Sequence, residues 1–220
     1  MTDILRIIPL GGVGEVGKNI TAIEAGGEIL VVDCGLAFPE PEMLGIDLVI
    51  PDATYLAENA ARVRAILITH GHEDHTGGLP YILPKLPGVP IYATALTVGL
   101  ITGKLKEHKL LEKTQIRTIE PGMEFRVGSS AITGFRVNHS IPDGIGYIIR
   151  TPAGTVVHTG DFKIDLTPPD GRRADLGLLA AVGTEGADFL LSDSTRAEKE
   201  GYTLSERTVE IGRASCRERV

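Results

Sequence analysis

Residues that can bind metal ions are concentrated in the stretch "LITHGHEDHTGGLPYIL", residues 67–83. His70 and His72 are two positions apart, so on extended backbone their side chains point the same way. Asp74 and His75 follow where we expect the chain to turn into a helix. Imidazole and carboxylate groups are good ligands for zinc and manganese. The pattern therefore predicts a metal site. The alternative is a polar surface loop whose histidines are incidental.

Two later strand ends carry the same kinds of residue. "RVNHSIPDG" ends a predicted strand with His139, and "VVHTGDFKID" ends another with Asp161. Each residue alone is typical of an ordinary strand end. Alongside the histidine stretch, both become candidates for further metal ligands.

The helices and strands that must position these residues are predicted from hydrophobic periodicity and from the glycines and prolines that separate them. A helix capped by Asp52 is expected over 52–63, and others begin near Thr76, at 95–109 and at 175–183. A hairpin turn is expected at 151–155. The last strand, at 188–194, is expected to be buried. Strands occur both in alternation with helices and in hairpin runs, so the fold class is α/β, with mixed sheets and helices outside. The expected strands are 4–10, 19–25, 28–35, 65–69, 90–94, 115–120, 124–128, 130–139, 146–151, 155–161 and 188–194.

The glycine-rich stretch "GVGEVG", Gly12 to Gly17, matches the spacing of a dinucleotide-binding loop, and Asp33 follows about 20 residues later. The helix that such a loop requires is missing, because "NITAIEA" is β-branched and leads straight into another strand. We therefore interpret the glycines as a hairpin loop.

Composition limits the class of protein. The chain has 220 residues, 42% of them hydrophobic, and 27 glycines, which suits one soluble domain or most of one. No apolar run reaches the roughly 20 residues that span a bilayer, and the start lacks the features of a signal peptide. With two cysteines, we expect a cytoplasmic protein with no membrane association. The net charge of −7 disfavours a purely electrostatic nucleic-acid binder, but not a nuclease whose cations supply positive charge.

Several motifs together closely resemble the ribonuclease J family, in the β-CASP branch of the metallo-β-lactamase superfamily. They are "LGGVGEVGKN", "HGHEDHTGGLPYIL", "NHSIPDGIGYII", "HTGDFKID" and "DSTRAEKEGYT", in order between Ile8 and Glu210. The resemblance implies an αββα metallo-β-lactamase sandwich, of which this chain would be an incomplete, N-terminal portion. Residues 1–195 would belong to that domain, and 196–210 would start the connection toward a β-CASP domain.

The resemblance also implies a ligand set for two divalent metal ions, most simply Zn²⁺, with Mn²⁺ also accepted. One metal would be held by His70, His72 and His139. The second would be held by Asp74 and His75, and Asp161 would bridge the two. Water between the metals would attack phosphorus, which makes Asp74 and Asp161 catalytic as well as metal-binding.

Two further acids receive roles from the resemblance. Asp33, in "VVDCG", is expected to orient the histidine loop without binding a metal itself. Asp193, in "SDSTRAE", matches an acid expected to act in catalysis by orienting a histidine that protonates the leaving oxygen. The alternative for Asp193 is an ordinary acid that caps the turn after a strand. The glycine loop is expected to lie near the metals, where its amides could approach phosphate.

The implied function is that of a metal-dependent ribonuclease acting in RNA processing and decay, including rRNA processing. It would degrade RNA from 5′-monophosphate ends in the 5′ to 3′ direction and also cut internally, as a homo-oligomer or in an RNA-decay assembly. A glyoxalase II-like thioesterase or a tRNA 3′-processing nuclease shares the histidine pattern, but "DSTRAEKEGYT" argues against both. A non-catalytic metal-binding subunit of a nuclease assembly is disfavoured because the ligand residues are intact.

The end of the chain, "RTVEIGRASCRERV", fits this interpretation badly. Residues Ile211 to Val220 can be encoded by a string found in a common short-read sequencing adapter, and Glu210 is suspect for the same reason. We therefore expect 211–220 to be a non-native tail. The chain would then lack two later histidines, one completing the second metal site and one acting as general acid. On this hypothesis the 220-residue polypeptide alone is poorly stable and nearly inactive.

Overall fold

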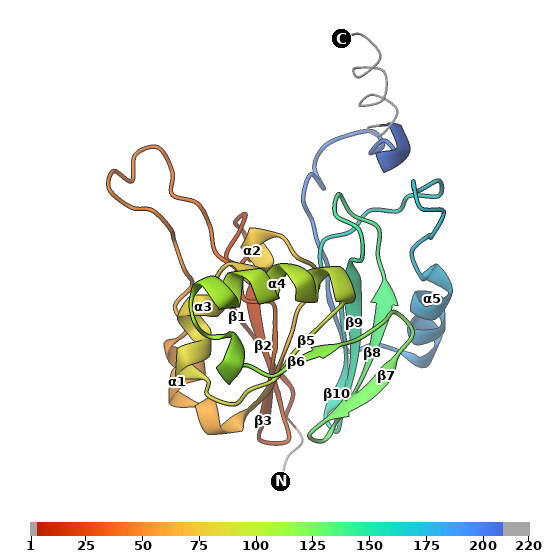
Figure 1. Cartoon of the computed structure of the whole chain (residues 1–220). Helices are drawn as coiled ribbons and strands as arrows, with labels where there is room; N and C mark the ends of the chain where they lie inside the picture. The colour runs from red at the N-terminus through yellow and green to blue at the C-terminus, as the bar shows by residue number, and fades with distance from the viewer. Residues whose placement is uncertain (1–3, 209–220) are drawn as a thin grey trace.

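Two β-sheets stack face to face, and helices cover their outer faces (Figure 1). The computed structural model describes residues 4–208. The expected tail at 211–220 and the suspect Glu210 lie outside the described residues.

The first sheet has six strands in the order β1-β2-β3-β4-β5-β6. The first three strands are antiparallel neighbours, and β3 to β6 run parallel. Gly26 and Gly27 form the turn between β2 and β3, and both adopt positive φ angles that favour glycine. The strands are β1 (Arg6–Gly11), β2 (Ile20–Ala25), β3 (Glu28–Val32), β4 (Val63–Leu67), β5 (Ile91–Ala93) and β6 (Ile116–Thr118).

The second sheet has five strands in the order β11-β10-β9-β8-β7. Strands β7 to β10 follow one another as antiparallel hairpins, and β11 pairs with β10 in parallel. The predicted hairpin turn at 151–155 is confirmed, because Thr151 pairs with Gly154. The strands are β7 (Glu124–Val127), β8 (Ser130–Arg136), β9 (Ile145–Thr151), β10 (Gly154–His158) and β11 (Phe189–Leu191).

The helices lie on both outer sides of the pair of sheets. On the outer face of the first sheet are α1 (Thr54–Glu58), α3 (Leu79–Ile82) and α4 (Ala95–Glu107), whereas α5 (Leu176–Glu185) covers the second sheet (Figure 1). Short connecting helices are α2 (Glu73–Thr76), η1 (Ala60–Arg62), η2 (Leu83–Lys85) and η3 (Leu111–Lys113).

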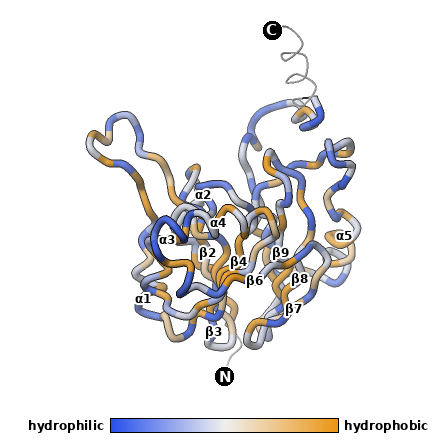
Figure 2. Tube along the Cα trace, viewed as in Figure 1, coloured by the Kyte–Doolittle hydropathy of each residue, from blue (hydrophilic) through white to orange (hydrophobic). Residues whose placement is uncertain are grey.

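Three apolar layers hold this arrangement together, and Figure 2 shows the hydrophobic residues concentrated along the strands. One layer packs helices α1, α3 and α4 on the first sheet, with Leu56 and Ile101 among its members. The middle layer joins the two sheets through residues such as Leu67 and Tyr147. The third packs Val182 of α5 on the second sheet. The predicted αββα sandwich is confirmed.

Two expectations about the helices were wrong in detail. The helix predicted over 52–63 breaks after Glu58 into α1 and η1, and the helix predicted near Thr76 is two short helices, α2 and α3. The second break falls at Gly77 and Gly78, which pack against backbone and side chains of the loop after β3. The N–H of Gly78 donates to the backbone oxygen of Cys34, and the backbone oxygen of Asp74 accepts the N–H of Asn19, so the helical hydrogen bond between Gly78 and Asp74 is not formed.

The last strand also differs from the prediction. Strand β11 forms within 188–194, but it is not buried: Phe189 is 44% exposed and Leu190 is 66% exposed. The reason is its place as the outermost strand of the second sheet, where only β10 pairs with it in the described part of the chain. Within residues 4–208, no helix has both the length and the apolar character needed to cross a membrane.

Glu24 on β2 joins the first sheet to the segment of α1 and η1. Its carboxylate accepts hydrogen bonds from the hydroxyl of Tyr55 and from the guanidinium groups of Arg62 and Arg6. The Tyr55 hydrogen bond is the main cause that lowers the pKa of Glu24 below its ordinary value, and Arg62 adds to it against the opposing effect of burial.

We expect Glu24→Gln to lower the free energy of unfolding at pH 7 by about 1–3 kcal/mol, because bonds to a buried charged group are lost. The folded-state pKa of Glu24 is depressed, so its contribution is present above the ordinary carboxyl value of about 4.3 and disappears as pH falls through the folded value. Urea unfolding from pH 7 to pH 3 should show the deficit shrinking. Glu58→Gln, an exposed acid at the end of α1, is the control. An unchanged deficit at pH 3 would contradict the prediction.

Candidate metal centre

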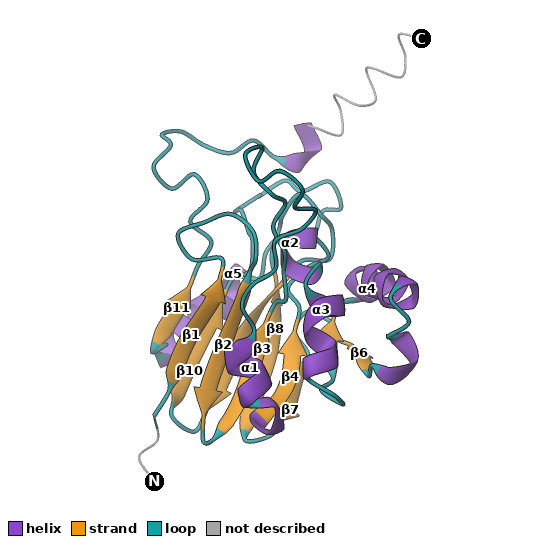
Figure 3. Ribbon diagram, turned by 90° about the vertical axis from the view of Figure 1, so that its left-hand side faces the viewer, coloured by secondary structure: helices purple, strands orange, loops and turns teal. Residues whose placement is uncertain are grey.

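The candidate residues gather at one edge of the sandwich, because four strands end there. Asp33 follows β3, the histidine stretch follows β4, His139 follows β8 and Asp161 follows β10. Strands β3 and β4 are parallel neighbours, and β8 and β10 are each antiparallel to β9, so the two strands of each pair end on the same side. Figure 3 shows the loops gathered beyond this edge of the sheets.

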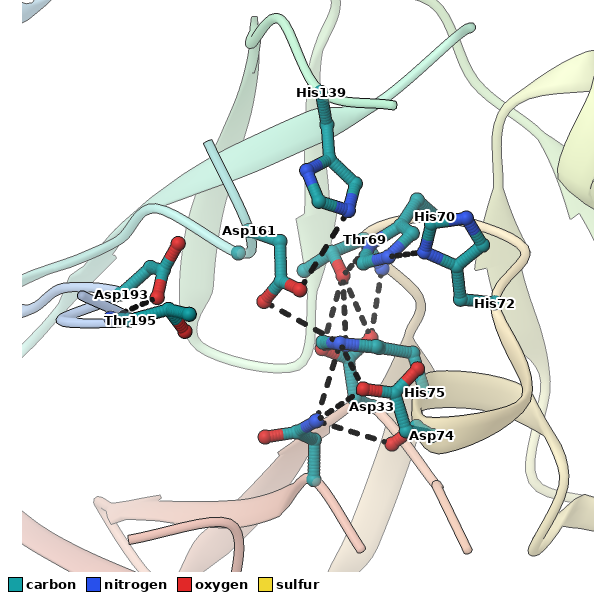
Figure 4. A network of polar contacts seen from close by, with 12 residues as sticks. Asp33, Thr69, His70, His72, Asp74, His75, His139, Asp161, Asp193 and Thr195 are labelled. Atoms are coloured by element: carbon teal, nitrogen blue, oxygen red, sulfur yellow. Dashed lines mark hydrogen bonds and ion pairs between the residues drawn. The ribbon is translucent and has the colours of Figure 1, made fainter. Parts of the chain in front are cut away.

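Three histidines form the first group of possible metal ligands. Nε2 of His70 lies 3.0 Å from Nδ1 of His72, and the ring of His139 lies 5.0 Å from each of theirs, centre to centre. One ring nitrogen from each histidine lies within 4.8 Å of the others. The structure therefore brings together the three residues expected to hold one metal (Figure 4).

A second group surrounds His75. Its Nε2 lies 3.4 Å from Oδ1 of Asp161 and 3.5 Å from Oδ2 of Asp74. The other oxygen of Asp161 lies 3.7 Å from Nε2 of His139. Asp161 is thus placed between the two groups, where one carboxylate can reach both (Figure 4). His70, His75 and Asp161 also have ligand atoms within 4.8 Å of one another, so His70 lies close to both groups.

Asp33 holds the histidine loop through hydrogen bonds to Thr69 and His75. One carboxylate oxygen accepts the backbone N–H of Thr69 at 2.8 Å, and the other lies 2.8 Å from Nδ1 of His75. The hydroxyl of Thr69 donates to the same carboxylate at 2.9 Å and lies 3.0 Å from Nδ1 of His70. Asp33 is buried and has a φ of 62°, a left-handed conformation that Asp tolerates better than most residues.

The electrostatics of the cluster favour the ligand forms of His70, His139 and Asp161. Burial lowers the pKa of His70 to about 3 and also lowers that of His139, so both are neutral at pH 7. Burial opposes ionisation of Asp161, but hydrogen bonding and charge interaction with His75 outweigh it and lower the pKa to about 2. Neutral imidazole and ionised carboxylate are the states that coordinate divalent cations. The donor set therefore fits divalent metal binding.

Protonation of His75 is governed by the acids around it. Burial lowers its pKa, but the carboxylates of Asp33, Asp161 and Asp74 act more strongly and raise it well above the ordinary value. This concentration of negative charge around one imidazole is what a bound cation would compensate.

Asp193 occupies the far side of the same cavity. Its carboxylate accepts the N–H of Thr195 at 2.7 Å, and its own N–H donates to the hydroxyl of Thr159 at 3.1 Å. These are the contacts of an acid that caps a turn, and among residues 4–208 no hydrogen bond or ion pair joins it to the six candidate ligands (Figure 4). The cavity measures about 610 Å³, and its lining includes the glycine loop, Asp74, His75, Asp161 and Asp193.

Two polar residues of the site were not identified from the sequence. Thr69 connects Asp33 to His70 and His75, and Asn19 contacts Asp74 and His75 from the end of the glycine loop. The position of Thr69 directly before His70 was the only local signal. Asn19 ends the motif "LGGVGEVGKN", but nothing in its spacing relates it to Asp74 and His75, which lie 55 and 56 positions away.

Two sheets packed between helices, with histidines and carboxylates at one edge, define the metallo-β-lactamase fold. A sequence model described as the beta-lactamase superfamily domain matches residues 28–211. The chain belongs to this superfamily.

Curated relatives confirm the resemblance to the ribonuclease J family. The chain is 49% identical to Ribonuclease J of Thermus thermophilus, over 98% of this chain and 40% of that protein. It is 50% identical to Ribonuclease J2 of Bacillus subtilis, over 94% of this chain and 37% of that protein. The chain thus spans about 40% of the length of these relatives.

Solved structures with low sequence identity show the same fold. A protein of unknown function from Enterococcus faecalis V583 aligns with a TM-score of 0.65 at 14% identity, covering 91% of this chain and 52% of that one. PqqB from Methylobacterium extorquens aligns with a TM-score of 0.56 at 16% identity, covering 90% and 78%.

We expect Asp33→Asn to lower the free energy of unfolding by about 1–3 kcal/mol, because the amide cannot satisfy Thr69 and His75 together at a buried position. Asp52→Asn is a matched control, since Asp52 also accepts the N–H and hydroxyl of a threonine, Thr54, but is exposed. Its expected loss is below about 0.5 kcal/mol. Urea unfolding of both variants measures the difference, and equal losses would contradict the role of Asp33 as a buried anchor.

Proposed function

We propose that this chain is the metal-binding part of a two-metal ribonuclease that hydrolyses the phosphodiester bonds of RNA. The observation that carries the proposal is the convergence of all six expected ligands at one sheet edge. It occurs in a chain about 50% identical to proteins named as ribonucleases J. The glyoxalase II-like, tRNA 3′-processing and non-catalytic alternatives are not favoured by these relatives.

Under this proposal, His70, His72 and His139 hold one divalent cation, and Asp74 and His75 hold the other, with Asp161 between them. The distances within each group and the neutral state of His70 and His139 support the assignment. Two such ions supply Lewis acidity and a nucleophile at neutral pH. Zinc is the expected metal, and manganese suits the same imidazole and carboxylate donors.

The surrounding residues orient the ligands and shape the cavity. Asp33 and Thr69 hold the histidine loop, as the hydrogen bonds at its base support. The glycine loop and Asp161 line the same cavity, which supports a role for the backbone amides of the loop in approaching phosphate oxygens. We assign to Asp193 the role of orienting the group that protonates the leaving oxygen. Its place in the same cavity supports this, and its turn-capping contacts are the competing explanation.

For the whole protein we propose action on 5′-monophosphate ends of RNA, in the 5′ to 3′ direction, together with internal cleavage. We place it in the cytoplasm, as a homo-oligomer or in an RNA-decay assembly. We further propose that residues 1–195 are the N-terminal part of the metallo-β-lactamase domain and that 196–210 lead toward a β-CASP domain. Support comes from the relatives, of which this chain spans about 40%.

We expect a protein that carries this chain at the length of its relatives to degrade 5′-monophosphorylated RNA. Chelation should abolish the activity, and added Zn²⁺ or Mn²⁺ should restore it. His139→Ala should lower the rate by at least about 100-fold, because one cation loses a ligand. His108→Ala is the control, since His108 lies at the exposed end of α4.

Quantified release of labelled nucleotides measures this prediction. Thioester hydrolysis without RNA degradation would reject the ribonuclease and favour another hydrolase of the fold. The 220-residue chain alone should show almost no RNA degradation.

A further inference from the structure

The side chain of Asn19 contacts both residues proposed to hold the second cation. Its Nδ2 donates to the backbone oxygen of Asp74 at 3.2 Å and lies 3.4 Å from the carboxylate oxygen Oδ2 of Asp74. The same nitrogen lies 3.1 Å from Nε2 of His75. The amide therefore lies beside the ligand atoms of both residues. Its contact with Asp74 can persist when metal is bound, whereas Nε2 of His75 cannot accept a hydrogen bond while it coordinates a cation.

The backbone of Asn19 is held independently of its side chain. Its N–H donates to the backbone oxygen of Asp74 at 3.0 Å, and its carbonyl accepts the N–H of Gly35 at 2.9 Å. Asn19 thus stays beside α2 and the loop after β3 even when its amide is removed. The contribution of the side chain can be tested separately from that of the fold.

An asparagine suits this position better than an acid. Asp74 is one-third exposed, so its carboxylate would otherwise be free to rotate toward solvent. A neutral amide with two hydrogens can donate to the backbone oxygen and to Oδ2 of Asp74, whereas a carboxylate at position 19 would repel the Asp74 carboxylate.

The glycine loop provides the room for the amide. A Cβ on Gly12 would lie 2.4 Å from Oδ1 of Asn19, and Gly12 has a φ of 83°. A side chain at Gly12 would therefore push the amide away from Asp74. This close approach and the positive φ explain the glycine at position 12.

We propose that Asn19 is a positioning residue that holds Asp74 in place, beside His75, for the second cation. The proposal rests on the proposed two-metal centre and adds a residue that binds neither metal. Outer groups of this kind typically change metal affinity by about 10–100-fold. The loss should be confined to the second cation, because the described hydrogen bonds of the Asn19 side chain go to Asp74 and His75, and none goes to His70, His72 or His139.

The test is titration of a metal-free protein that carries this chain at the length of its relatives, because the second cation site of the 220-residue chain is expected to lack one ligand. Zn²⁺ binding is followed by calorimetry and Co²⁺ binding by visible absorption. The wild-type protein should bind two cations. Asn19→Ala should bind the first unchanged and the second about 10–100-fold more weakly, with loss of the second Co²⁺ spectral component. Asn59→Ala is the matched control, since that amide donates to the backbone oxygen of Tyr55, far from the candidate ligands, and should change neither.

Equal weakening of both cations, or no weakening of either, would overturn the role of Asn19. Binding of one cation by the wild-type protein at the length of its relatives would overturn it too, while leaving the three-histidine site intact. Binding of none would reject the proposed metal centre as well.

Two further measurements remain if Asn19→Ala does not fold. Gly12→Ala keeps the amide but displaces it, and should also weaken the second cation selectively. In the wild-type protein at the length of its relatives, the side-chain amide NMR signals of Asn19 should shift with the second equivalent of Zn²⁺. A shift complete at the first equivalent, or none, would contradict the proposal.

Discussion

The buried carboxylate of Asp33 is the contact on which the candidate centre depends. A carboxylate in the interior needs several hydrogen-bond donors to offset its lost hydration. Here these donors come from Thr69, through its N–H and hydroxyl, and from Nδ1 of His75. Satisfying Asp33 therefore fixes both ends of the segment from 69 to 75. It also leaves Nε2 of His75 facing Asp74 and Asp161, which is the orientation that a metal ligand requires.

The packing of the two sheets decides which strand ends meet around this anchor. The histidine stretch belongs to the first sheet, whereas His139 and Asp161 belong to the second. Tyr147, fully buried between the sheets, donates its hydroxyl to the backbone oxygen of Ile68 at 2.6 Å. The apolar layer between the sheets thus includes a hydrogen bond to the segment that leads into the histidine loop. Loss of that packing would separate the two ligand groups, so stability and metal geometry are linked in this fold.

Local pattern predicted most of the fold and singled out histidines and acids that the structure brings together. The alternation of β-branched residues between glycines located the strands, and the spacing of His70 to His75 indicated a metal site before any contact was known. The exposure of β11 was not predictable, because the burial of an edge strand depends on its neighbours and not on its own residues. The break at Gly77 and the contact of Asn19 with Asp74 were missed for a similar reason. Both arise from close approach of segments distant in sequence.

Under the proposed function, the charge of the metal centre would explain how an acidic chain can act on a polyanion. The net charge of −7 provides no general attraction for RNA, and Asp33, Asp74 and Asp161 concentrate further negative charge at the cavity. Two divalent cations would more than offset these three carboxylates locally. The same ions that activate the reaction would also attract phosphate groups into the cavity. Electrostatic attraction for the substrate would then be confined to the surroundings of the cavity, because salt at physiological ionic strength screens charge interactions beyond about 8 Å.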